Sequence, residues 1–282
     1  MAVTEELKKL VEQMPETDKR GMYTQNMDAE KINTTAADIA KGGKESLLGL
    51  IEMLAKPGSV ENAKPHFALH CVVNHALIVK DEKLRKAFCE AMASQLENDK
   101  LLVYNRNYLC QELQWAGRDE ACGALGKALL NEDLTEAAAM ALAAIGQERA
   151  AAPLRAAAAK AKGKCRLSVI DALAALADPK AADIFTQALK DTDSEVRIAA
   201  AVGLAKLALP DSAGPLLKLA GSAKGWERTQ TTKACLVHAE ALAAAGKKPQ
   251  AKQVYQSLQK THAGKDERHV QEAVRRGLAA IA

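Results

Sequence analysis

Two histidines one helical turn apart are the residues best placed to do chemistry in this sequence. His66 and His70 stand at positions i and i+4 of one predicted helix, a spacing that can bring two imidazole nitrogens onto one metal ion. The predicted helix continues to His75, which turns toward a different face. No HExxH motif occurs, and no carboxylate nearby in the sequence supplies an obvious third ligand. We therefore expect exposed or partly packed histidines and no bound metal.

Cysteine is the second candidate for reactivity. No pair of cysteines has the CxxC spacing of zinc ribbons and thioredoxin-like redox sites, and each cysteine lies inside an apolar helical pattern. Because cysteine packs well as a small buried side chain, we expect buried free thiols. An even number would permit disulfides, but a chain of 282 residues does not need them for stability. The six are Cys71, Cys89, Cys110, Cys122, Cys165 and Cys235.

The remaining catalytic signatures are missing from the sequence. There is no nucleophile elbow, P-loop or GxGxxG motif. Aromatic side chains that could stack on a nucleobase, such as Trp115, Trp226 and Tyr104, are scattered over distant segments. We expect a protein without enzymatic activity and without a cofactor.

The composition indicates which elements must position these residues. Of the 282 residues 57 are alanine, 48% are hydrophobic and only 3% are aromatic. These values argue against a collagen, a disulfide-rich miniprotein, an all-β sandwich and long disorder. They favour an all-α fold of closely packed, alanine-rich helices.

An internal repeat gives that fold its organisation. The clearest unit runs from Pro179 to Leu209 and is predicted as helix, short turn and helix. The turn is residues 191–194, in which Asp193 or Ser194 can cap the second helix. The same helix–turn–helix pattern recurs along the chain. The second helices are expected to end at Gly117, Gly146, Asp178 and Gly246. Their spacing of about 29 to 40 residues is typical of two-helix solenoids, and about seven helix pairs are predicted.

The stretch DTDSEVRIAAAVGLAKL, residues 191–207, resembles the signature of HEAT repeats, D-x-D-x-x-V-R-x-x-A-x-x-A-L. It resembles in particular the short bacterial and phycobilisome-lyase-like HEAT repeats. Residues 105–145 also resemble HEAT proteins of planctomycetes and related bacteria. Gly203 departs from the pattern, which favours alanine. The resemblance covers residues 44–282 and implies a right-handed α-α superhelix, one continuous array with a TPR-like character near 229–262. Residues 1–43 are then N-terminal capping helices with a loop.

The resemblance also implies roles for individual residues. Arg197 is expected to be structural, with its guanidinium on Asp191, Asp193 or the equivalent acid of a neighbouring repeat. Among HEAT-like enzymes, a di-iron hydroxylase uses His-Glu dipeptides. This sequence has none, the nearest being His238-Ala239-Glu240. A HEAT-like DNA glycosylase would need aromatic residues on a basic wall. Because HEAT-like bilin lyases exist, the resemblance also leaves the alternative that the protein is an accessory enzyme of that type.

In HEAT stacks the second helices line the concave side, so the starts of these helices are the candidate binding residues. Such a row of polar and basic groups could bind an acidic or extended peptide. Alternatively, these side chains are only solvated or capping groups, and Asn105 suits a helix N-cap. The candidates are Tyr104, Asn105, Arg106, Asn107, Lys164, Arg166, Arg228 and Lys233.

The predicted function is a non-catalytic scaffold that binds an unknown protein or peptide on this concave side. The alternative is polyanion or nucleic-acid binding through two basic strips, residues 155–166 and 247–276, although the net charge of +4 is mild. No apolar run is long enough to span a membrane. The first residues, MAVTEELKKLVEQM, form a charged amphipathic helix and no signal peptide. Two locations of the protein are therefore left as alternatives: the cytoplasm or, if a signal peptide has been removed, the periplasm.

Overall fold

The computed structural model describes residues 3–18 and 27–282. Within these ranges it contains sixteen α-helices, three short 3-10 helices and no strand. The predicted all-α fold is therefore confirmed. From α3 onward the helices form seven consecutive pairs (α3/α4 to α15/α16), which is the number expected from the repeats.

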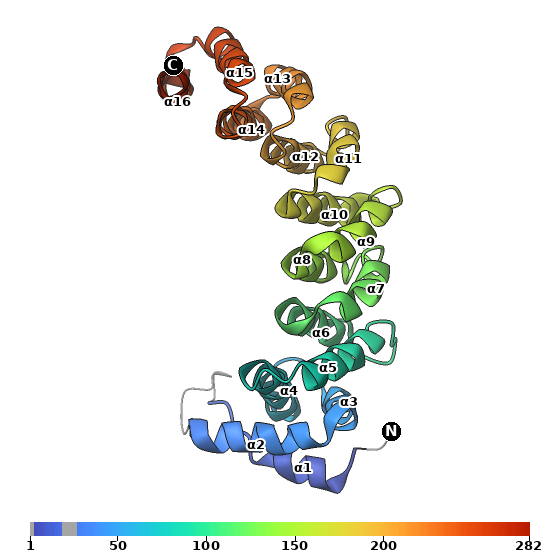
Figure 1. Cartoon of the computed structure of the whole chain (residues 1–282). Coiled ribbons are helices and arrows are strands. Elements are labelled where there is room, and N and C mark those ends of the chain that lie inside the picture. The colour runs from blue at the N-terminus through green and yellow to red at the C-terminus, as the bar shows by residue number, and fades with distance from the viewer. Residues whose placement is uncertain (1–2, 19–26) are drawn as a thin grey trace. The chain divides into compact units, whose positions relative to one another are not determined.

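The helices of the N-terminal half are shown in blue to green in Figure 1. Their bounds are α1 Glu5–Glu12, α2 Ala29–Lys41, α3 Gly43–Met53, α4 Val60–Ile78, α5 Glu82–Ser94, α6 Val103–Ala116, α7 Asp119–Ala128 and α8 Thr135–Ile145. Those that follow are α9 Gln147–Ala158, α10 Gly163–Leu176, α11 Ala182–Ala188, α12 Ser194–Lys206, α13 Ala213–Ser222, α14 Gly225–Ala244, α15 Lys248–Thr261 and α16 Arg268–Ile281. The 3-10 turns Pro179–Ala181, Pro210–Ser212 and Lys265–Glu267 lead into α11, α13 and α16.

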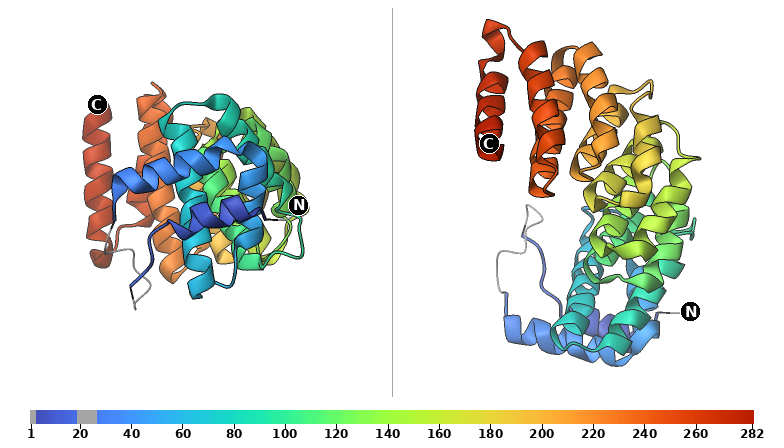
Figure 2. Two further views of the ribbon diagram at one scale, coloured as in Figure 1. Left: turned by 90° about the horizontal axis from the view of Figure 1, so that it is seen from below. Right: turned by 45° about the horizontal axis from the view of Figure 1, so that its top comes forward.

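Two compact units divide the chain, Met1–Pro153 and Leu154–Ala282. In the first unit, α3, α5 and α7 pack in one layer and α4, α6 and α8 in the other. Helix α2 packs against α4 and crosses the pair of α3 and α4 at a steep angle (Figure 2). Part of the loop predicted within residues 1–43 falls on residues 19–26, outside the described ranges.

The second unit repeats the arrangement. Helices α10, α12 and α14 pack side by side in a second-helix layer, α14 also contacts α16, and α13 and α15 pack in the opposite layer. The repeat predicted at Pro179–Leu209 is confirmed as helix, turn and helix, with its second helix running from Ser194 to Lys206. Whether residues 44–282 form a single array stays a prediction.

Turn chemistry explains where the helices begin and end. Asp193 caps α12 by accepting a hydrogen bond from the Glu195 amide at 2.9 Å. One of the four predicted helix ends needs correction. Gly117 is the C-cap of α6, as expected, with a φ of −70° that is not left-handed. The residue that ends α10 is the left-handed Ala177 (φ 50°) and not Asp178. Asp178 instead caps the following 3-10 turn.

Alanine and glycine let the helices approach closely. The core residue Phe185 of α11 is fully buried, and its ring lies on Gly203 of α12. A Cβ atom at position 203 would come within 2.6 Å of the ring. The departure from the HEAT pattern at Gly203 therefore has a packing cause, because this glycine makes room for a large aromatic side chain. Within the described ranges, no helix has the length and apolar character needed to cross a lipid bilayer.

Candidate binding face

The exposed side of the second helices in the N-terminal unit is built from positions one turn apart. On α6 the outward positions are Asn107, which is half-buried, and Gln111 and Trp115, which are exposed. The neighbouring helices α4 and α8 also present half-buried or exposed positions one turn apart. The equivalent positions are His66, His70 and Asn74 on α4 and Glu136, Met140 and Ala144 on α8. These nine positions, together with Tyr104 at the start of α6, are called the N-terminal face below.

Two contacts one turn apart join α4 to α6 on this face. The ring of His66 stacks on the ring of Tyr108, with 3.8 Å between centroids and 18° between planes. The Tyr108 hydroxyl donates a hydrogen bond to the His66 carbonyl oxygen at 2.8 Å. One turn further, His70 Nδ1 lies 3.0 Å from Glu112 Oε1 and 3.3 Å from Oε2. Each pair is separated by 42 residues, because the two helices run in register.

The environments of the two histidines differ. The hydrogen bond with Glu112 raises the pKa of His70, although partial burial opposes it. Burial lowers the pKa of His66, and the neighbouring charge of Glu112 offsets this only in part. The Glu112 side chain is almost fully buried, 6% exposed, whereas that of His70 is 49% exposed. Glu112 could not be predicted as a partner of His70 from the sequence, because it lies on another helix, 42 residues away.

The four predicted residues at the start of α6 occupy different environments. Tyr104 is 52% exposed. Asn105 and Arg106 are buried. Asn105 donates hydrogen bonds to the carbonyl oxygens of residues 54 and 55 at 3.2 and 3.3 Å, and Arg106 pairs with Asp99 at 3.2 Å. Asn105 is not the N-cap of α6, because that position is Leu102. Asn107 donates to the carbonyl oxygens of residues 103 and 133.

The predicted residues of the C-terminal unit fall into two groups. Lys164 and Lys233 are exposed. Arg166 pairs with Asp191 and donates to the carbonyl oxygen of residue 158 at 3.1 Å. Arg228 pairs with Glu267 at 2.9 Å and donates to the carbonyl oxygen of residue 220 at 3.3 Å. Both arginines therefore hold the fold together, and their charges are opposed by carboxylates of the same unit.

These pairs belong to a series of three in which an arginine of a second helix binds an acid of the next helix pair. Between Arg166–Asp191 and Arg228–Glu267 lies Arg197, whose Nε and Nη2 bind the two oxygens of Glu227 at 2.6 and 2.8 Å. Arg197 also donates to the carbonyl oxygen of Asp191 at 2.6 Å. The hydrogen bond from Arg228 lowers the pKa of Glu267. Burial opposes ionisation of Asp191, but hydrogen bonds, including one from Arg166, still lower its pKa. Asp193 contributes the cap of α12.

The basic strips are also partly neutralised within the fold. In residues 155–166, Arg155 pairs with Asp178 and Arg166 with Asp191. In residues 247–276, the adjacent arginines at 275 and 276 both pair with Glu272. Less free positive charge is therefore present than the sequence suggests.

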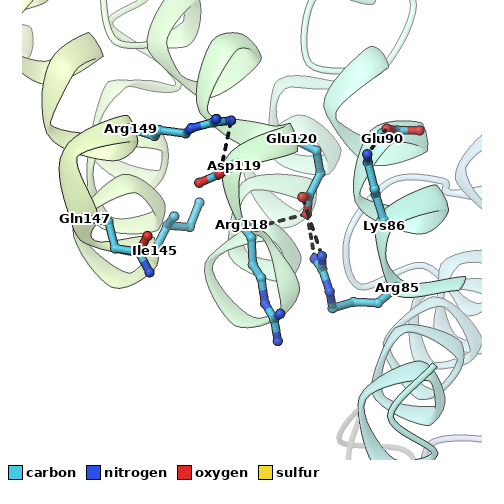
Figure 3. Close-up of a pocket in the computed structure, with 9 residues that line it drawn as sticks. All are labelled: Arg85, Lys86, Glu90, Arg118, Asp119, Glu120, Ile145, Gln147 and Arg149. Carbon is cyan, nitrogen blue, oxygen red and sulfur yellow. Dashed lines mark hydrogen bonds and ion pairs between the residues drawn. The ribbon is translucent and has the colours of Figure 1, made fainter. Parts of the chain in front are cut away.

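A pocket of about 570 Å³ opens near α5 and α7 of the N-terminal unit. Figure 3 shows Arg85 directed at Glu120 and Arg149 directed at Asp119, while the guanidinium of Arg118 points away from both pairs. Arg85, buried at the base, binds Glu120 at 2.6 Å, and Arg149 binds Asp119 at 3.1 Å. Because cations and carboxylates are matched, this pocket offers no concentrated charge to a ligand. Nowhere in residues 3–18 and 27–282 do three or more histidine, cysteine or acidic side chains gather as a metal-binding group.

Comparison with known proteins confirms the resemblance to HEAT repeats where it was clearest. The family model of HEAT repeats matches residues 159–237. No curated protein matches the chain. Among solved structures, an engineered protein is 19% identical, with 98% of this chain and 77% of that chain covered and a TM-score of 0.49.

Two further solved structures are similar over most of the chain. The complex of the two phycocyanin lyase subunits from Nostoc is 17% identical, with 90% and 94% of the chains covered and a TM-score of 0.38. A designed armadillo repeat protein bound to the peptide (KR)4 is 20% identical, with 97% and 100% covered and a TM-score of 0.28. Since all three TM-scores are below 0.5, these likenesses carry nothing about the activity or partners of this chain.

Proposed function

We propose that this protein is a non-catalytic scaffold that binds an extended segment of a partner protein on the N-terminal face. One observation carries the proposal: large apolar side chains stand exposed on this face. Tyr104, Trp115 and Met140 are 52%, 65% and 52% exposed. Exposed apolar groups that share one face of a folded protein mark interaction sites more often than single scattered ones do.

The chemistry between these anchors suits a peptide backbone. Gln111 and Asn74 lie between or beside them on the outward side, and an amide side chain both donates and accepts hydrogen bonds. Exposed aromatic groups supply the large contact area that dominates binding energy at most interfaces. The arginines at 106, 166 and 228, which were expected to attract an acidic peptide, are occupied by carboxylates. The proposed partner segment is therefore amphipathic rather than strongly acidic.

Peptide display against the full chain tests this proposal. We expect selected peptides to lose at least about 2 kcal/mol of binding free energy with Trp115→Ala, as buried aromatic anchors do, and to weaken with Tyr104→Ala. Two control variants locate the effect. Leu130→Ala removes an apolar side chain that is 47% exposed in the turn after α7, and Trp226→Ala removes the exposed tryptophan of α14. Peptides that bind the Trp115 and Tyr104 variants as tightly as the unchanged chain would refute the proposed face.

Polyanion binding through the basic strips is the second candidate. The exposed lysines at 160 and 162 favour it, while the pairing of Arg155 and Arg166 weakens it. This function predicts affinity for DNA or RNA that falls steeply as salt is added. Absence of binding at low salt would reject it. An accessory enzyme of the bilin-lyase type is supported only by the sequence resemblance, and lack of catalysis stays a prediction.

A further inference from the structure

The two histidines of the N-terminal face are held in fixed positions by α6. His66 and His70 are one turn apart on α4, which places their Cβ atoms about 6 Å from one another. Their α6 contacts, Tyr108 and Glu112, are also one turn apart. Both rings therefore lie along the junction of α4 and α6, on the same side of α4 and at its solvent boundary.

Each ring keeps a nitrogen for a ligand. Glu112 engages His70 through Nδ1, at 3.0 Å. A buried carboxylate in this position favours the tautomer with hydrogen on Nδ1, so that the lone pair is on Nε2. His66 is held by stacking on Tyr108, and within the described part of the chain neither of its ring nitrogens is engaged in a hydrogen bond.

We propose that His66 and His70 form a two-imidazole site for a divalent transition-metal ion such as Zn²⁺, with Glu112 as the positioning residue that orients His70. Imidazole is a preferred ligand of zinc, copper and nickel ions. A carboxylate behind a ligating histidine fixes the orientation of its ring and raises its basicity. Water, or a group of a bound partner, completes the coordination of the ion.

Cysteine thiols of the chain do not offer a competing site of the same kind. Five of the six are buried. The exception, Cys71, is half-buried on α4 and follows His70 in the chain. Successive helix residues are rotated by about 100° around the axis, so Cys71 lies to one side of the row that His66 and His70 form. The two imidazoles, which share one side of the helix, are therefore the ligands expected at this surface.

The test is a calorimetric titration of the full, reduced chain with Zn²⁺ at neutral pH. We expect one Zn²⁺ per chain and loss of that binding with His66→Ala and with His70→Ala. Glu112→Gln should weaken it by about 10- to 100-fold, the usual effect of removing an outer-shell carboxylate. Two control variants, His75→Ala on another side of α4 and His269→Ala on α16, should leave the affinity unchanged.

The folding of each variant is checked by circular dichroism, and Cu²⁺ electron paramagnetic resonance supplies a second readout. Two equivalent nitrogen couplings in the unchanged chain, reduced to one in either alanine variant, would support the site. No Zn²⁺ binding, or binding that persists in either histidine variant, would overturn it. An unchanged affinity in the Glu112→Gln variant would overturn the positioning role of Glu112.

Discussion

Replacing Gly203 by alanine tests how tightly α11 and α12 are packed. A methyl group at this position would stand 2.6, 2.7 and 2.9 Å from three atoms of the Phe185 ring, which is fully buried and cannot swing into solvent. Overpacking of this kind costs about 1–3 kcal/mol, while alanine gains about 0.8–1 kcal/mol over glycine in a helix interior. The net expectation is a loss of stability of up to about 2 kcal/mol.

A second glycine provides the matched control. Gly123 lies inside α7, and a Cβ atom there would meet no other atom within 4 Å. Gly123→Ala should therefore stabilise the chain by about 0.8–1 kcal/mol. Since both variants gain the same helix propensity, the difference between them isolates the overpacking cost, about 1–3 kcal/mol.

Urea unfolding together with amide hydrogen exchange is the appropriate assay, because exchange reports the stability of each helix separately. Faster exchange in α11 and α12 of the Gly203→Ala variant is expected. Adding Phe185→Leu should recover part of the loss by removing the ring. Equal stabilisation by Gly203→Ala and Gly123→Ala would refute the reasoning.

Three further outcomes follow from the contacts of single residues. Arg197→Ala should destabilise the chain by about 1–3 kcal/mol in urea unfolding, because it leaves the part-buried carboxylate of Glu227 without its two hydrogen bonds; an unchanged midpoint would contradict this. Burial lowers the pKa of His238 below its ordinary 6.5, so acid favours the unfolded chain, and stability should fall as pH drops below about 6.5. His238→Gln should flatten that pH dependence. Cys89 is buried, which raises the pKa of its thiol to about 12, whereas Cys71 is only half-buried. A thiol reagent at pH 8 should therefore label Cys71 first in the folded chain. Rapid labelling of Cys89 would show that its helix opens.

The fold could be predicted from sequence because its signals are local. Alanine-rich helices, an aspartate before Ser194 and the repeat from Pro179 to Leu209 are each visible within a single repeat. The error at Asp178 has the same local origin. A glycine or aspartate after a helix permits several endings, and the packing of the next helix selects one.

The candidate site was harder to predict because it depends on contacts between repeats. The starts of the second helices are polar, as a binding wall would be. However, Arg166 and Arg228 form ion pairs with acids of the next repeat, and Arg106 forms one with an acid of the preceding loop. Their charges are therefore not free to bind a partner. The residues left for a partner lie further along the helices, such as Gln111 and Trp115. Helical periodicity is the sequence signal for these residues, because they recur about one turn apart on the side of α6 opposite its apolar positions.

Pairing within the fold also bears on how the proposed scaffold discriminates among partners. In the C-terminal unit each of these arginines is paired with a carboxylate. The pairs therefore hold neighbouring repeats together and do not attract a charged ligand. On the N-terminal face, Tyr104, Trp115 and Met140 are exposed and bring no charge. Apolar and aromatic contacts are only weakly screened by salt, in contrast to ion pairs at a surface. A partner held by that face should therefore stay bound at high salt, whereas one held by the basic strips should be released. The salt dependence of binding thus distinguishes the scaffold function from polyanion binding.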